Sequence, residues 1–142
     1  MKTLITNAKI VNEGDIKELD LLIEDGLISK IEKDLQHKEA DEIIDAKSLY
    51  LLPGIIDDQV HFREPGLTQK ATIASESRAA VTGGITSFME MPNVVPPTTN
   101  MEAIEQKITI AQATSFANYS FYIGATNDNI EDLLALDDQL VC

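Results

Sequence analysis

The sequence predicts an α/β protein in two parts, a small β-rich module followed by strands and helices that alternate. In residues 1–52, apolar and polar residues alternate over short stretches, which is typical of half-buried strands. From residue 53 onward, short apolar runs take turns with segments of helical periodicity. Strands that alternate with helices favour a parallel sheet with crossover helices. We therefore expect two domains, residues 1–52 and residues 53–142.

The first part predicts a small β-sheet. Residues 3–12 alternate between apolar and polar side chains as one strand does. Residues 19–31 predict a hairpin, because Asp25-Gly26 between two apolar runs is a strong turn signal. Two further short strands are expected in residues 41–52.

The second part predicts three strand–helix pairs and the opening of a fourth strand. Each strand is an apolar run, and each helix follows it after a short loop. Strands are expected at 54–62, 85–91 and 117–125, and helices at 72–84, 100–115 and 129–139, with the last strand beginning at residue 140.

The two longer helices each carry a face that would pack on the sheet. Asn100 precedes the second helix and has a side chain suited to capping its first turn. The packing faces are expected to contain Ile73, Ser77, Ala80 and Val81 in the first helix, and Ile104, Ile108 and Ala111 in the second.

The position of the polar residues favours one parallel-sheet architecture. No Gly-rich phosphate loop follows the first strand at 54–62, as it would in many doubly wound sheets. Instead, polar residues stand where strands end, which is where a (β/α)8 barrel keeps its chemistry. Three strand–helix units do not close a barrel, and they would leave two sheet edges unpaired. We therefore expect a truncated barrel, a fragment of a longer protein. The polar residues at strand ends are His61, Arg63, Asn93, Thr126 and Asn127.

The composition excludes some partners and compartments. The chain has 11 basic and 24 acidic residues, a net charge of -13, which argues against binding to nucleic acid or to an anionic membrane. Its single cysteine, Cys142, allows no disulfide within the chain. No signal peptide and no apolar run of membrane-spanning length are present, so we expect a cytoplasmic protein. His37 lies in a charged stretch and is expected in a solvated turn.

The segment GIIDDQVHFREPG, residues 54–66, is the clearest candidate site. On a regular strand, alternate residues share a face, so Asp57, Gln59, His61 and Arg63 would lie together. The Arg63 guanidinium is suited to a carboxylate, and a neutral His61 nitrogen is suited to zinc. The alternative is that His61 is only a packed side chain and that Arg63 pairs with the neighbouring Glu64.

These residues carry a resemblance. The stretch LPGIIDDQVHFREPGLTQKATIASESRAAVTGGITSFMEMPNVVPPTT closely resembles the N-terminal part of dihydroorotases, which belong to the amidohydrolase superfamily. In that family the first barrel strand typically reads Pro-Gly-x-Ile-Asp-x-His-x-His-x-Arg-Glu-Pro-Gly. Residues 1–52 also resemble the small β-sandwich that precedes the barrel. The matching residues are Pro53-Gly54, Asp57, His61, Arg63-Glu64-Pro65-Gly66, Gly83-Gly84 and Met91-Pro92-Asn93.

The resemblance implies a function and a role for each of these polar residues. His61 would bind metal, with Asp57 orienting the metal-binding groups, and Arg63 and Asn93 would hold the substrate carboxylate. The family uses zinc, two ions per full-length chain, to interconvert dihydroorotate and N-carbamoyl-aspartate in pyrimidine biosynthesis. It is often dimeric, so a homodimer is an expectation as well. Asp58, Thr86 and Glu90 are interpreted as structural.

The sequence departs from the family in two ways. Gln59 stands where the family has the first histidine of its metal-binding pair, and a carboxamide is a weaker zinc donor than imidazole. The family's carboxylated lysine, further histidines and catalytic aspartate lie on later strands, beyond Cys142. A catalytic zinc normally needs three protein ligands, so we expect the 142-residue chain alone to be inactive.

Two alternatives remain beside the dihydroorotase interpretation. Hydantoinases and allantoinases are related cyclic amidohydrolases, but their substrates lack the carboxylate that Arg63 and Asn93 would bind. Some dihydroorotase-like proteins have lost metal ligands and serve as non-catalytic scaffolds for aspartate carbamoyltransferase. Gln59, in place of a histidine, is consistent with such a loss. The presence or absence of the family's metal ligands on later strands would decide between a catalytic dihydroorotase and a non-catalytic scaffold.

Overall fold

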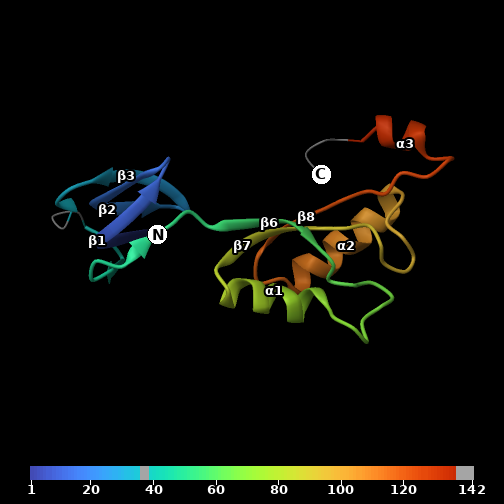
Figure 1. Cartoon of the computed structure of the whole chain (residues 1–142), viewed down its shortest axis with the longest axis horizontal. Coiled ribbons are helices and arrows are strands. Elements are labelled where there is room, and N and C mark those ends of the chain that lie inside the picture. Colours follow the sequence, from blue (N-terminus) through green and yellow to red (C-terminus); the bar gives the residue numbers. More distant parts are fainter. Residues whose placement is uncertain (36–38, 137–142) are drawn as a thin grey trace. The chain divides into compact units, whose positions relative to one another are not determined.

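The computed structural model describes residues 1–35 and 39–136. The predictions for His37, for Cys142 and for a strand at 140–142 lie outside the described residues. The chain divides into two compact units, Met1–Pro53 and Gly54–Cys142. Together the units form a mixed α/β protein, as the sequence predicts (Figure 1).

The first unit is a single five-stranded sheet. Its strand order is β3-β2-β1-β4, and β5 also pairs with β1. The first three strands are antiparallel, whereas β4 and β5 run parallel to β1. The β-sandwich expected for this part stays a prediction. The strands are β1 (Lys2–Asn12), β2 (Asp15–Glu24), β3 (Leu27–Glu32), β4 (Glu42–Asp45) and β5 (Tyr50–Leu51).

Two tight turns shape this sheet. The hairpin predicted at Asp25-Gly26 is confirmed, and both residues have positive φ, 51° and 82°. Strand β2 begins earlier than predicted because Glu13-Gly14 makes a second turn of the same kind, with φ of 50° and 82°. Turns with two successive positive φ values match the twist of a hairpin, and glycine adopts them without steric cost.

The second unit is a three-stranded parallel sheet of order β6-β7-β8, which confirms the predicted alternation of strands and helices. Figure 1 shows α1 and α2 on the same face of this sheet. The core lies between the sheet and these two helices. It contains Val60, Phe62, Ile73, Phe88, Ile104, Ala111 and Phe121. The elements are β6 (Ile55–Val60), α1 (Ile73–Thr82), β7 (Ile85–Glu90), α2 (Met101–Thr114), β8 (Asn118–Phe121) and α3 (Ile130–Leu134).

The predicted helix faces agree with the structure except at one position. Asn100 caps α2 by accepting a hydrogen bond from the Ala103 N–H at 2.9 Å. In α1, Ile73 and Ser77 are buried, but Val81 is 45% exposed, so its predicted place on the packing face is wrong. Val81 lies eight residues after Ile73, and at about 100° per residue the helix has turned it roughly 80° away from that face.

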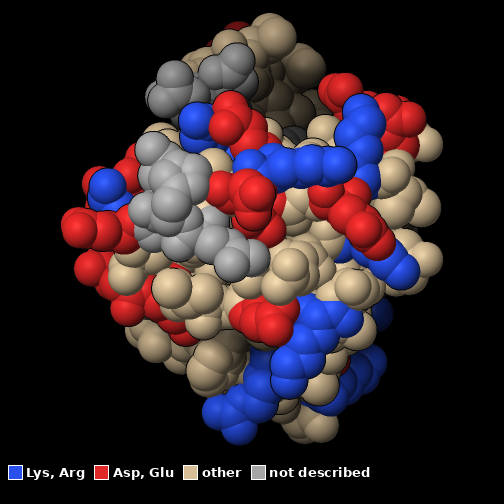
Figure 2. Space-filling model, turned by 90° about the vertical axis from the view of Figure 1, so that its left-hand side faces the viewer, with Lys and Arg blue, Asp and Glu red and all other residues tan. Residues whose placement is uncertain are grey.

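Charged side chains of both signs cover the surface. On the face in Figure 2, Lys and Arg side chains lie among Asp and Glu side chains, with uncharged areas between them. Among residues 1–35 and 39–136, no helix is long and apolar enough to cross a membrane.

Candidate functional site

A bulge in β6 changes the predicted arrangement of the first candidate residues. Asp57 pairs with Phe88 of β7, and Val60 pairs with Glu90, so three steps along β6 match two along β7. The extra residue interrupts the strict alternation expected from Asp57 to Arg63. The Asp57 carboxylate accepts a hydrogen bond from the Gln59 N–H at 3.2 Å, within the bulge. Its observed contact is therefore with the backbone that presents Gln59.

His61 and Asn93 are brought together although 32 residues separate them. They lie in two segments that follow neighbouring strands, the arginine turn (residues 61–63) after β6 and the asparagine turn (residues 91–93) after β7. The His61 Nδ1 lies 2.8 Å from the Asn93 Oδ1. An amide oxygen only accepts hydrogen bonds, so the ring donates through Nδ1. This leaves the His61 Nε2 and the Asn93 amide N–H groups for other ligands.

Arg63 is held by its backbone rather than by its side chain. Its φ is 70°, in the left-handed region, and its N–H donates to the Glu90 Oε1 at 3.1 Å. Within the described part of the chain, its guanidinium has no hydrogen-bond or ion-pair partner. Pairing with Glu64 is not observed, because the Glu64 carboxylate instead accepts from the Ile73 N–H at 2.8 Å, at the start of α1. A negative group there also favours the helix dipole.

The loops that follow the two turns are in contact. The Val95 N–H donates to the Pro65 carbonyl at 3.2 Å. Gly66 has a φ of 82°, and a Cβ at this position would overlap the Val95 carbonyl oxygen. Glycine is therefore needed for the close approach of these loops.

A buried ion pair lies beneath the two turns. The Lys107 Nζ is 3.0 Å from the Glu90 Oε2, and both side chains have no solvent exposure. Burial raises the pKa of the Glu90 carboxyl and lowers the pKa of the Lys107 ammonium, while the attraction between their charges opposes both shifts. The sequence reasoning left Glu90 as structural and missed Lys107. The available signal was the position of Lys107 between Ile104 and Ala111, on the buried face of α2.

These residues do not make a zinc centre by themselves. In residues 1–35 and 39–136, no group of three or more His, Cys, Asp or Glu side chains could hold a metal ion. His61 contributes one imidazole, and Gln59 offers only a carboxamide.

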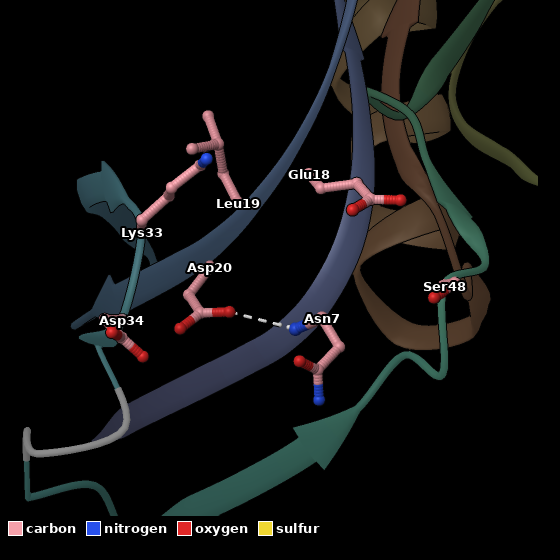
Figure 3. Close-up of a pocket in the computed structure, with 7 residues that line it drawn as sticks. All are labelled: Asn7, Glu18, Leu19, Asp20, Lys33, Asp34 and Ser48. Atoms are coloured by element: carbon pink, nitrogen blue, oxygen red, sulfur yellow. Dashed lines mark hydrogen bonds between the residues drawn. The ribbon is translucent and has the colours of Figure 1, made fainter.

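The first unit has a polar cavity of about 290 Å³ with a different character (Figure 3). Its one buried acid, Asp20, accepts hydrogen bonds from the backbone N–H groups of Asn7 and Leu35, each at 2.9 Å. Both carboxylate oxygens are thus used by the fold. The lining residues are Asn7, Glu18, Leu19, Asp20, Lys33, Asp34 and Ser48.

Comparisons with known proteins identify the family. A model of the family described as dihydro-orotase-like matches residues 48–140, so the chain belongs to this family. The chain is 40% identical to a dihydroorotase of Methanosarcina acetivorans, over 93% of this chain and 28% of that protein. It is 36% identical to a dihydroorotase of Lactobacillus leichmannii, over 97% of this chain and 33% of that protein.

Solved structures of cyclic amidohydrolases are also similar. The L-hydantoinase (dihydropyrimidinase) from Arthrobacter aurescens matches with a TM-score of 0.89 and 30% identity, over 92% of this chain and 29% of that one. The dihydropyrimidinase from Brevibacillus agri matches with a TM-score of 0.80 and 31% identity, over 94% and 30%. The chain thus spans about three tenths of the length of these relatives.

Proposed function

We propose that this chain is the N-terminal part of a dihydroorotase, and that Arg63 and Asn93 bind the substrate carboxylate. The observation that carries the proposal is the pairing of His61 with Asn93, which leaves the amide N–H groups of Asn93 as donors beside the arginine turn. Arg63 adds a guanidinium without a partner among the described residues. Dihydroorotate and N-carbamoyl-aspartate both carry a carboxylate that would accept hydrogen bonds from these donors.

The charge and geometry of these donors support a carboxylate ligand. A guanidinium can donate two parallel hydrogen bonds to one carboxylate, and such charge-assisted bonds are the stronger kind. An amide donor adds direction without adding charge. A cyclic amide without a carboxylate would leave both groups unused.

The finer points of the fold and cofactor belong to this proposal. The parallel sheet β6-β7-β8 would be the start of a (β/α)8 barrel, which its likeness to hydantoinases supports. Zinc would bind the longer protein through His61, together with ligands outside the described residues and with Gln59 at the position of the family's first histidine. No catalytic step is assigned to this chain, and we expect residues 1–142 alone to be inactive. A homodimer is also part of the proposal.

Two other functions compete. A hydantoinase function is favoured by the TM-score of 0.89 to the Arthrobacter aurescens enzyme, but it leaves the Arg63 guanidinium without a role. A non-catalytic scaffold for aspartate carbamoyltransferase is favoured by Gln59. Replacement of Gln59 by histidine would leave a scaffold inactive, whereas a hydantoinase would hydrolyse a cyclic amide without a carboxylate.

A chimera tests the proposal. This chain would replace the matched segment of the Methanosarcina acetivorans dihydroorotase, with Gln59 or with Gln59→His. Zinc content and dihydroorotate hydrolysis would be measured for both. We expect the histidine variant to bind more zinc and to hydrolyse dihydroorotate faster, because imidazole is the better donor. The control is Gln106→His, the same substitution at an exposed position of α2, which should change neither quantity.

The possible results separate the three functions. Dihydroorotate hydrolysis by either chimera supports the dihydroorotase proposal. A chimera that binds zinc but prefers a cyclic amide without a carboxylate supports the hydantoinase function. A folded chimera that stays inactive with histidine at position 59 contradicts the proposal and favours the scaffold.

A further inference from the structure

The buried Glu90–Lys107 pair needs an explanation beyond stability. Both side chains are fully buried, and taking two charges out of water costs free energy that their attraction does not always return. Apolar side chains of similar size often serve a core equally well. The other contacts of the pair suggest what the charges do.

On one side, Glu90 holds the arginine turn. Its Oε1 accepts from the Arg63 N–H at 3.1 Å, while its Oε2 faces Lys107. Arg63 has a φ of 70°, a conformation that costs a non-glycine residue free energy. Such a conformation persists only where the surrounding structure holds it. A carboxylate is a strong acceptor for a backbone N–H, so it can maintain this turn.

On the other side, Lys107 holds the asparagine turn. Its Nζ donates to the Met91 carbonyl at 3.2 Å, two residues before Asn93. The same Nζ lies 5.3 Å from the centre of the Phe121 ring, which limits where the ammonium can move. The ion pair therefore joins two backbone segments that follow separate strands.

We propose that the Glu90–Lys107 pair is a positioning device that holds the arginine turn and the asparagine turn at a fixed spacing. The carboxylate-binding role of these turns rests on the proposed function. Their fixed spacing is a property of the chain itself. The pair holds the backbone N–H of Arg63 on one side and the carbonyl of Met91, two residues before Asn93, on the other.

Hydrogen–deuterium exchange at single-residue resolution tests this positioning in the 142-residue chain. The double variant Glu90→Leu/Lys107→Met replaces both charges by apolar side chains and leaves no unpaired buried charge, so we expect its thermal midpoint to fall less than that of Lys107→Met alone. The Arg63 amide should nevertheless exchange about 10- to 100-fold faster, the loss expected for a hydrogen bond to a charged group. A folded double variant that exchanges the Arg63 amide within about threefold of the native rate would overturn the proposal.

A second variant separates an effect on the two turns from a general loosening of the unit. Lys107→Met should speed exchange at the Arg63 amide at least about tenfold more than at the Phe116 amide. The Phe116 N–H is bonded to the buried Ser77 Oγ at 3.1 Å, away from the pair, and reports general loosening of the unit. Equal acceleration at both amides would mean that the pair only stabilises the fold.

The exchange measurement is independent of any substrate. A separate calorimetric titration with dihydroorotate, on the chimera with the Methanosarcina acetivorans enzyme, tests the ligand. If dihydroorotate does not bind while Arg63 loses protection in the variants, the proposed function fails and the positioning stands. If dihydroorotate binds and Arg63 keeps its protection, the positioning fails and the proposed function stands.

Discussion

Among the described residues, each unit buries one acidic side chain, and the two acids have different partners. In the first unit, Asp20 is satisfied by two backbone N–H groups and closes the fold around a polar cavity. In the second unit, Glu90 faces a buried lysine and accepts a hydrogen bond from the backbone N–H of Arg63. A buried acid next to a buried cation is the costlier arrangement. It occurs in the unit whose loops carry His61, Arg63 and Asn93.

The comparison teaches how a buried charge can serve an exposed group. Asp20 connects β1 to the segment that follows β3, through the backbone N–H groups of Asn7 and Leu35. Glu90 and Lys107 connect two turns that carry Arg63 and Asn93. Substitutions in both units can sharpen or break this distinction, and the largest effect is expected at Lys107.

Lys107→Met should destabilise the second unit by about 3–5 kcal/mol, because it leaves the buried Glu90 carboxylate without its cation. The loss should also depend on pH. Burial raises the pKa of the Glu90 carboxyl in the folded state above its unfolded value. The carboxyl therefore stabilises the fold most at low pH, where it is protonated, and this stabilisation is lost as the pH rises through the folded-state pKa. Denaturant unfolding at pH 5 and pH 8 measures both effects. A variant as stable as the native chain would contradict this account. So would a variant whose loss of stability relative to the native chain is larger at pH 5 than at pH 8.

Gly66→Ala should cost about 3 kcal/mol, from a strained backbone and from overlap with Val95. Gly26→Ala in the first unit is the matched control. Gly26 has the same φ of 82°, but no atom lies within 4 Å of where its Cβ would be. This control should cost only about 1–2 kcal/mol, the price of a left-handed alanine. Equal losses in the two variants would show that the contact between the loops contributes nothing.

Asp20→Asn should cost less stability than Lys107→Met, about 1–3 kcal/mol, because one of two backbone N–H groups loses its acceptor. Amide exchange should accelerate at Asn7 or Leu35 and stay unchanged at Arg63. The change should also be nearly independent of the residue at position 107. Faster exchange at Arg63 in this variant would end the distinction between the two acids.

Much of this fold could be predicted from the sequence because local signals carry it. The Asp25-Gly26 hairpin depends on residues next to each other. The cap at Asn100 likewise depends on its own first turn. The parallel sheet follows from the alternation of strands and helices. The family motif also led to His61 and Asn93, whose contact joins residues far apart in the chain.

What the sequence could not predict depends on partners across the fold. The bulge near Gln59 exists only in the register between β6 and β7, so alternation alone placed Asp57 and His61 on one face. Lys107 carries a charge that usually indicates exposure, and only Glu90 explains its burial. The left-handed turn at Arg63 also depends on Glu90, 27 residues away. Metal binding and substrate choice stay predictions.

The central claim is that Arg63 and Asn93 select a substrate with a carboxylate. The most direct measurement is the ratio of kcat/KM for dihydroorotate to that for dihydrouracil, which is dihydroorotate without its carboxylate. It would be made on the Gln59→His chimera, with and without Arg63→Met. We expect dihydroorotate to be preferred, and the preference to fall roughly 10- to 100-fold in the arginine variant, the value of a charge-assisted hydrogen bond. A preference for dihydrouracil, or a ratio that Arg63→Met does not change, would contradict the claim.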